Sequence, residues 1–208
     1  MAGVGINEGS EKTVAADEYG SAAAPSSGQK VQWVGLAPGT PGALAPVSNS
    51  NPVHVARALE WVQVTVTLDT SIYASGDLLF DATAITGASL SSGGQCELVS
   101  VSVLDEDDQG TAIDLYVTNL STTWGSLNAA VNISDAVGRG IQAYIPIAAA
   151  DFKDLGGCRV AQPRIAQNVG VICETSGGTS LYVAGVCASG TPTYTSAGVR
   201  INFGFKRS

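Results

Sequence analysis

Apolar and polar side chains alternate in eight short stretches of residues 59–208, whereas residues 1–58 show almost no such pattern. In Trp61–Asp69, every second residue from Val62 to Leu68 is apolar, and the residues between them are Gln or Thr. Successive side chains of a β-strand point to opposite faces, so this alternation predicts a strand with one face in a core. The other stretches are Leu78–Thr86, Glu97–Asp105, Ala112–Asn119, Ile141–Ile147, Asn168–Glu174, Ser180–Ala188 and Gly198–Phe205.

These stretches are rich in Val, Ile, Thr and Tyr and are bounded by Gly, Asp and Ser clusters, which is typical of strands joined by turns. The pattern predicts an all-β fold, an eight-stranded antiparallel β-sandwich resembling a jelly roll, with only short helical turns in its long connections. Val99 and Ile141 are among the side chains expected to point inward, and Pro146 indicates an edge strand or a strand end. The sequence does not determine the order of the strands.

Residues 1–58 are predicted to form an extended N-terminal arm, and residues 59–208 the sandwich domain. Four prolines between Pro38 and Pro52 exclude a helix and a central strand there, while Val31–Leu36 is compatible with one strand. An arm that becomes ordered on assembly loses conformational freedom, so it must bury apolar groups on a partner. In the alternative, the arm's tryptophan packs back on its own domain. The candidate interface residues are Trp33, Val34, Leu36, Leu44, Val53 and Val55.

The formal net charge of −8 at pH 7 disfavours binding to nucleic acid or to an anionic membrane. Between Ala58 and Gly138 there are eleven acidic residues and no Lys or Arg, whereas basic residues predominate from Arg139 onward. If the strands interleave, the two sets mix on one solvated surface; otherwise they offer complementary charge between copies or towards a basic partner. No long apolar run and no basic leader before an apolar segment occur, so we expect neither a membrane span nor a signal peptide.

No group of residues has the spacing of a catalytic or cofactor-binding motif, so we expect a protein that is not an enzyme and needs no cofactor or metal. The four cysteines lack zinc-ligand spacing and are expected to be small buried hydrophobes, as suits a reducing cytoplasm. A turn at Gly177-Gly178 would place Cys173 opposite about Tyr182 in a hairpin. His54 is the only histidine, and no Ser or Cys motif points to a triad with it.

Two further features have alternative interpretations. The acidic run Asp105–Asp108, followed by Gln109-Gly110, partly resembles a calcium loop but lacks its bidentate Glu, so an Asp/Gly hairpin turn is the simpler interpretation. Trp124 lies between strands and is either a lid over one end of the core or an aromatic that stacks on a sugar. Trp61, at the start of the first strand, is expected to pack rather than to bind.

Several phrases of the sequence carry a resemblance to a known family. They are Asn49–Val53, Leu68–Asp77, Val103–Gly110, Ile133–Ala136, Asp154–Gly157 and the closing hairpin Ser180–Phe205. Over residues 30–208 the chain resembles the virion structural proteins of tailed bacteriophages, and most closely a capsid decoration (cement) protein. The resemblance implies a jelly-roll-type β-sandwich on the particle exterior and an N-terminal arm that reaches along neighbouring subunits.

The expected function is to bind the outside of a phage capsid and to stabilise it by bridging neighbouring capsid subunits. The implied partners are the major capsid protein and further copies of this chain, in a homotrimer, after synthesis in the host bacterial cytoplasm. The alternative is a phage tail, neck or fibre protein whose sandwich binds a receptor or glycan. That alternative predicts functional aromatic and polar residues clustered at one end of the sandwich, around Trp124 and Tyr194, and few copies per particle.

Overall fold

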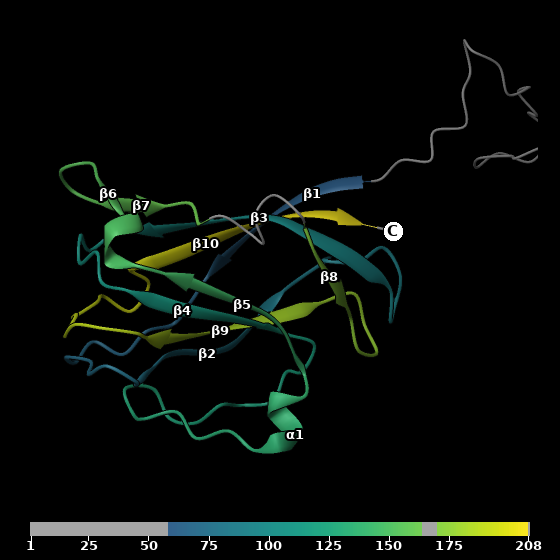
Figure 1. The fold of residues 1–208 in the computed structure, drawn as a ribbon, viewed down its shortest axis with the longest axis horizontal. Helices are drawn as coiled ribbons and strands as arrows, with labels where there is room; N and C mark the ends of the chain where they lie inside the picture. Colours follow the sequence, from purple (N-terminus) through teal and green to yellow (C-terminus); the bar gives the residue numbers. More distant parts are fainter. Residues whose placement is uncertain (1–57, 164–169, 208) are drawn as a thin grey trace, which may run out of the picture. The chain divides into compact units, whose positions relative to one another are not determined.

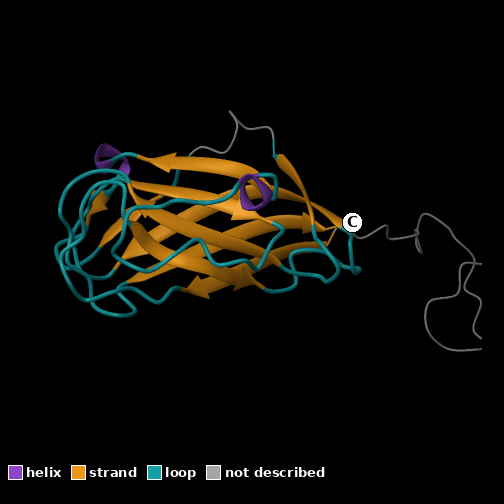
Figure 2. Ribbon diagram, turned by 90° about the horizontal axis from the view of Figure 1, so that it is seen from below, coloured by secondary structure: helices purple, strands orange, loops and turns teal. Residues whose placement is uncertain are grey.

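Two antiparallel β-sheets stack face to face in the computed structural model, which describes residues 58–163 and 170–207 (Figure 1). Loops and two short helical turns, α1 (Asp135–Gly138) and a 3₁₀ turn at Ala149–Asp151, complete the described part (Figure 2). None of the helices among these residues is long and apolar enough to cross a membrane. The strands are β1 Ala58–Thr65, β2 Leu78–Ile85, β3 Gln95–Asp105, β4 Ile113–Thr118, β5 Ile141–Ile147, β6 Lys153–Asp154, β7 Arg159–Ala161, β8 Val171–Glu174, β9 Leu181–Cys187 and β10 Val199–Arg207.

The eight longer strands are wound as one folded-over hairpin. The first strand pairs with the last (β1 with β10), and the second pairs with the second-last (β2 with β9). The third of these strands then pairs with the sixth (β3 with β8), and the central pair is β4 with β5. One sheet therefore has the order β1-β10-β3-β7-β6, with β8 also paired to β3, and the other has the order β2-β9-β4-β5. This winding is that of a jelly roll, so the predicted fold class is confirmed.

Every predicted stretch overlaps a strand, but the predicted hairpins are wrong. β8 pairs with β3 while β9 pairs with β2 and β4, so the chain crosses between sheets after Gly177-Gly178 and Cys173 lies opposite Cys96. β9 and β10 also belong to different sheets, so Ser180–Phe205 is not a hairpin. Jelly-roll winding sends most successive strands to opposite sheets, which local turn signals do not reveal. The short strands β6 and β7 were not predicted because two or three residues show no alternation.

The core lies between the inward faces of the two sheets. Two bulges change the predicted faces: the register of β3 shifts opposite Gly204 and Phe205, so Leu98 is buried in place of Val99. The register between β4 and β5 also shifts, and Ile141 packs outside the sandwich. An extra residue in one strand moves the side chains beyond it to the other face. The residues predicted inward in β4 and β10 are all fully buried: Ile113, Leu115, Val117, Val199, Ile201, Phe203 and Phe205.

A smaller apolar cluster covers part of the outer face of the four-stranded sheet. It contains Trp124 and Val137 from the connection between β4 and β5, packed on Leu78 and Ala184 of the sheet. The indole of Trp124 lies 5.2 Å from the ring of Tyr116, measured between ring centroids. Trp124 therefore covers a sheet face, and the prediction that it closes one end of the core is wrong.

Candidate interaction surface

Strand β1 carries large apolar side chains on both of its faces. Val64 is buried and Val62 half-buried on the core side, whereas Leu59 and Trp61 are 73% and 58% exposed on the other side. Trp61 was expected to pack, but its position in the alternation turns it to solvent. Large apolar side chains exposed side by side mark a candidate contact with another macromolecule.

The outer face of the six-stranded sheet extends this apolar region across the strands. Trp61 lies opposite Gly204, which in turn lies opposite Ser100. A Cβ at Gly204 would collide with the Ser100 hydroxyl and come within 3.5 Å of the indole, so glycine keeps this row flat. We call Leu59, Trp61 and Ile172, which is 73% exposed on β8, the outer-sheet surface. The row that joins Leu59 to Ile172 across the sheet is Leu59, Lys206, Glu97 and Ile172.

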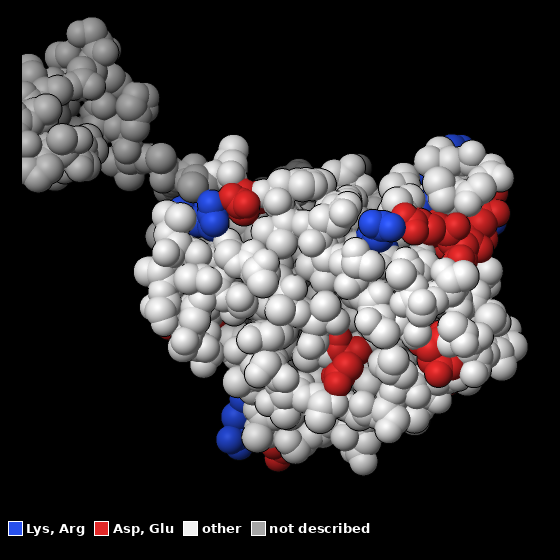
Figure 3. All heavy atoms as spheres, turned by 180° about the vertical axis from the view of Figure 1, so that it is seen from behind, with Lys and Arg blue, Asp and Glu red and all other residues white. Residues whose placement is uncertain are grey.

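Four ion pairs join charged side chains of this sheet and its connections across the strands. In each pair the cation comes from the basic C-terminal part of the sequence and the acid from residues 60–108. The interleaved strands therefore mix the two sets within one molecule, as the solvated-surface interpretation required. Figure 3 shows one face of the molecule, most of which is neither acidic nor basic. The pairs are Arg207–Glu60 at 2.6 Å, Lys206–Glu97 at 3.3 Å, Arg200–Glu106 at 2.7 Å and Arg159–Asp108 at 2.7 Å.

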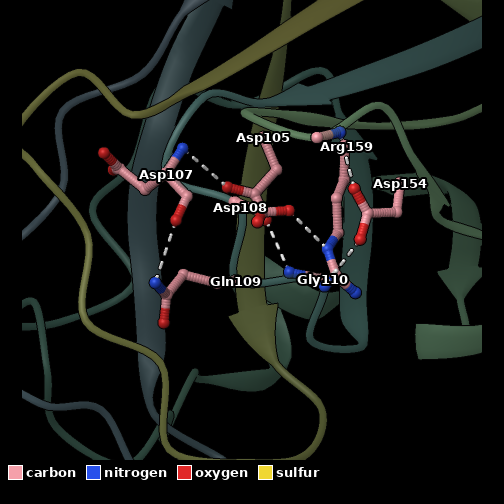
Figure 4. Close-up of polar contacts among 8 residues, drawn as sticks. Asp105, Asp107, Asp108, Gln109, Gly110, Asp154 and Arg159 are labelled. Carbon is pink, nitrogen blue, oxygen red and sulfur yellow. Dashed lines mark hydrogen bonds and ion pairs between the residues drawn. The ribbon is translucent and has the colours of Figure 1, made fainter.

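The acidic segment after β3 connects the two sheets and is not a hairpin turn. Asp105 is fully buried, and its two carboxylate oxygens accept hydrogen bonds from the backbone N–H groups of Asp107 at 3.0 Å and Gly110 at 2.6 Å (Figure 4). Burial raises the pKa of Asp105, while these backbone hydrogen bonds oppose the rise. The segment turns through positive φ at Asp108 (57°) and Gly110 (58°). Asp105 thus organises the backbone of the connection.

The remaining carboxylates of the segment hold other loops. Asp107 accepts from the backbone N–H of Thr195 at 2.7 Å, and Asp108 accepts from Arg159 Nε at 2.7 Å. Arg159 also reaches Asp154 at 3.5 Å. In the described part of the chain, no group of three or more His, Cys, Asp or Glu side chains is placed to hold a metal ion. The carboxylates of this segment therefore hold neighbouring loops together through hydrogen bonds and ion pairs.

The aromatic residues that a glycan site was expected to use are not accessible. Trp124 is 4% exposed and Tyr194 is 2% exposed, and they belong to two different apolar clusters. Tyr194 packs edge-on against Tyr73, with ring centroids 6.3 Å apart, and its hydroxyl lies 3.0 Å from that of Thr111. An aromatic ring is exposed on the four-stranded sheet at Tyr144 of β5, whose hydroxyl donates a hydrogen bond to the Asp114 carboxylate at 3.0 Å.

The predicted arm residues Trp33, Val34, Leu36, Leu44, Val53 and Val55, together with His54, lie outside the described residues, and their roles stay predictions. Leu59 and Ile172 were not predicted from the sequence to be exposed surface residues. The signal was present: in both strands apolar residues occupy the odd and the even positions, so one set must face outward when the other enters the core.

Three of the four cysteines are buried as expected, and Cys158 is half-buried. Burial raises the pKa of Cys96 to about 11 and that of Cys173 to about 12, so both thiols are protonated at neutral pH. Buried neutral thiols behave as small apolar side chains.

No protein-family model matches this chain, and no curated protein matches it. One solved structure that matches is the cryo-EM structure of the giant freshwater prawn Macrobrachium rosenbergii extra small virus (XSV) VLP. Its sequence identity is 11%, its TM-score is 0.27, and the match covers 86% of this chain and 96% of that chain. A score of this size does not establish a shared fold, so the jelly-roll assignment rests on the strand pairings.

Proposed function

We propose that this chain is a structural virion protein that binds the outside of a tailed-phage capsid and stabilises it by bridging neighbouring capsid subunits. The observation that carries the proposal is the outer-sheet surface, where Leu59, Trp61 and Ile172 are exposed on a sheet. The charged residues between them, Lys206 and Glu97, are paired with each other. The jelly roll supports the proposal as an architecture found in viral capsid proteins, among others. The partners are the major capsid protein and two further copies of this chain, on the capsid exterior.

The proposed mechanism is added interface across subunit boundaries, which opposes the outward pressure of packaged DNA. A stable biological interface buries more than roughly 1,000 Å² in total, which the arm and the outer-sheet surface would supply together. Trp61 is the natural anchor, because tryptophan is enriched among the residues that dominate binding energy. Burying its exposed 58% on a partner is worth about 2–3 kcal/mol per copy from apolar area alone.

The test compares capsids assembled with and without this chain, after heating and after osmotic shock. Particles that carry the chain should lose their DNA at a higher temperature. Trp61→Glu should weaken binding to the capsid, whereas Leu155→Glu, at a 62% exposed position in the turn after β6, should bind as the wild type does. Equal resistance of capsids with and without the chain would refute the stabilising role.

The copy number per virion separates this function from the tail, neck or fibre alternative. A cement protein is present in hundreds of copies, whereas a tail protein is present in about six or twelve, a consequence of the closed symmetry of its ring. A quantitative gel of purified virions measures the ratio to the major capsid protein. Burial of Trp124 and Tyr194 removes the aromatic residues on which the glycan-binding alternative depended.

A further inference from the structure

Most sheet edges in the described residues are protected against pairing with another strand. β2 is bulged and is partly paired with the connection ahead of α1, where the Leu78 N–H donates to the Ala129 carbonyl at 2.8 Å. β5 contains Pro146, and the Gln142 side chain bonds to both backbone groups of Glu174 in β8, at 2.7 and 2.8 Å. β6 is two residues long. Short, bulged, proline-containing or covered edges are the usual defences against unwanted pairing.

The outer edge of β1 has none of these defences. All eight residues of β1 pair in continuous register with β10, without a bulge, and within the described residues no strand pairs with the other edge of β1. The strand contains no proline or lysine, and its single charged residue, Glu60, is paired with Arg207. A long, regular, apolar edge of this kind is a template for an added strand.

We propose that the segment Val31–Leu36 from the arm of a second copy adds to the edge of β1 as a further strand. The N-terminal stretch outside the described residues ends at residue 57, directly before Ala58, the first residue of β1. For its own arm to pair there, the chain would have to return through residues 37–57, and a structureless connection of more than roughly 12–15 residues is uncommon within a compact domain. A second copy supplies the segment without that return.

The side chains of the segment suit this position. Val34 and Leu36 share one face of an extended strand, and Trp33 lies on the other. If Val34 and Leu36 lie beside the half-buried Val62, the added strand extends the core. Trp33 then lies on the same side of the sheet as Trp61. Neighbouring aromatic and branched side chains on adjacent strands stabilise such pairing. This inference goes beyond the proposed function, because contact between copies does not require a capsid.

The experiment uses full-length purified chains without capsids, in a Cys158→Ser background. A chain with Gly35→Cys is mixed and refolded with a tagged chain carrying Gln63→Cys, on the exposed face of β1, and a short bismaleimide is added. The expected product is a cross-link between the two chains. Leu155→Cys, at the opposite edge of the same sheet, is the matched control in place of Gln63→Cys and should give none.

Two outcomes overturn the inference. A cross-link formed within single chains that carry both cysteines, and not between chains, means that the arm pairs with its own domain. The absence of any cross-link means that the edge of β1 does not receive the arm. Amide hydrogen exchange of the unmodified protein provides a second measurement: exchange in β1 should slow as protein concentration rises, and concentration-independent exchange contradicts the inference. Neither result depends on whether the chain stabilises a capsid.

Discussion

Asp105→Asn tests how the connection between β3 and β4 is held. Asp105 is fully buried and accepts one backbone hydrogen bond on each carboxylate oxygen, from Asp107 at 3.0 Å and from Gly110 at 2.6 Å. An asparagine amide keeps one acceptor oxygen, so one backbone N–H is left facing an NH₂ donor. A lost hydrogen bond accounts for about 0.5–1.5 kcal/mol and an unsatisfied buried donor for about 1–3 kcal/mol. These contributions overlap, and we expect the free energy of unfolding to fall by about 1–3 kcal/mol.

Urea unfolding measures this loss directly, and a thermal scan should show Tm lower by about 2–12 °C for a domain of this size. The matched control is Glu106→Gln, the neighbouring acidic residue, whose ion pair with Arg200 is partly exposed. Removing an exposed ion pair changes stability by less than about 1 kcal/mol. If Asp105→Asn destabilises the protein no more than Glu106→Gln does, Asp105 does not organise the connection and the reasoning is refuted.

The same variant has a defined pH dependence. Burial raises the pKa of Asp105 above its unfolded value of about 3.9, so the folded protein holds this proton to higher pH than the unfolded chain does. The stability contributed by this residue is therefore full below about pH 4 and is lost as the pH rises through the folded pKa. The difference in unfolding free energy between wild type and Asp105→Asn should narrow as the pH rises above about 4. A difference that widens over this range contradicts the direction of the shift.

Three further predictions concern other parts of the fold. Gly185→Ala places a Cβ against the ring of Phe80 and should lower the free energy of unfolding, measured in urea, by about 1–3 kcal/mol. Gly157→Ala, where the added Cβ meets open space, should change it by less than about 0.5 kcal/mol. Equal effects of the two substitutions would contradict the crowding at Gly185. Trp124→Ala should lower the unfolding free energy by about 3–5 kcal/mol and Trp124→Phe by clearly less, since the indole N–H has no hydrogen-bond partner among the described residues. Similar losses for the two variants would show that this N–H matters. A thiol-specific disulfide reagent should react quickly with Cys158 alone in the native protein, because burial raises the pKa of the other three thiols. After unfolding, all four thiols should react. A second fast-reacting thiol in the native protein would contradict the burial of the other three.

The candidate surface was only partly predictable. The alternation that placed Val62 and Val64 in the core also required Leu59 and Trp61 to face outward, so two of the three residues of the outer-sheet surface were implicit in one strand. Ile172 joins it only because β8 pairs with β3 across the Lys206–Glu97 row, a contact between segments far apart in the chain. The absence of protection along the edge of β1 became visible only by comparison with the other edges.

By itself the sequence determined that this is an all-β chain with eight principal strands, and it determined which face of most strands is buried, because side-chain alternation is a local property of the backbone. The tertiary structure alone decided which strands pair, where the bulges in β3 and β5 exchange one inward residue for another, and that Asp105 is buried rather than exposed in a turn. Those outcomes depend on contacts between distant segments, whose free energy comes from packing and backbone hydrogen bonds that no short stretch contains.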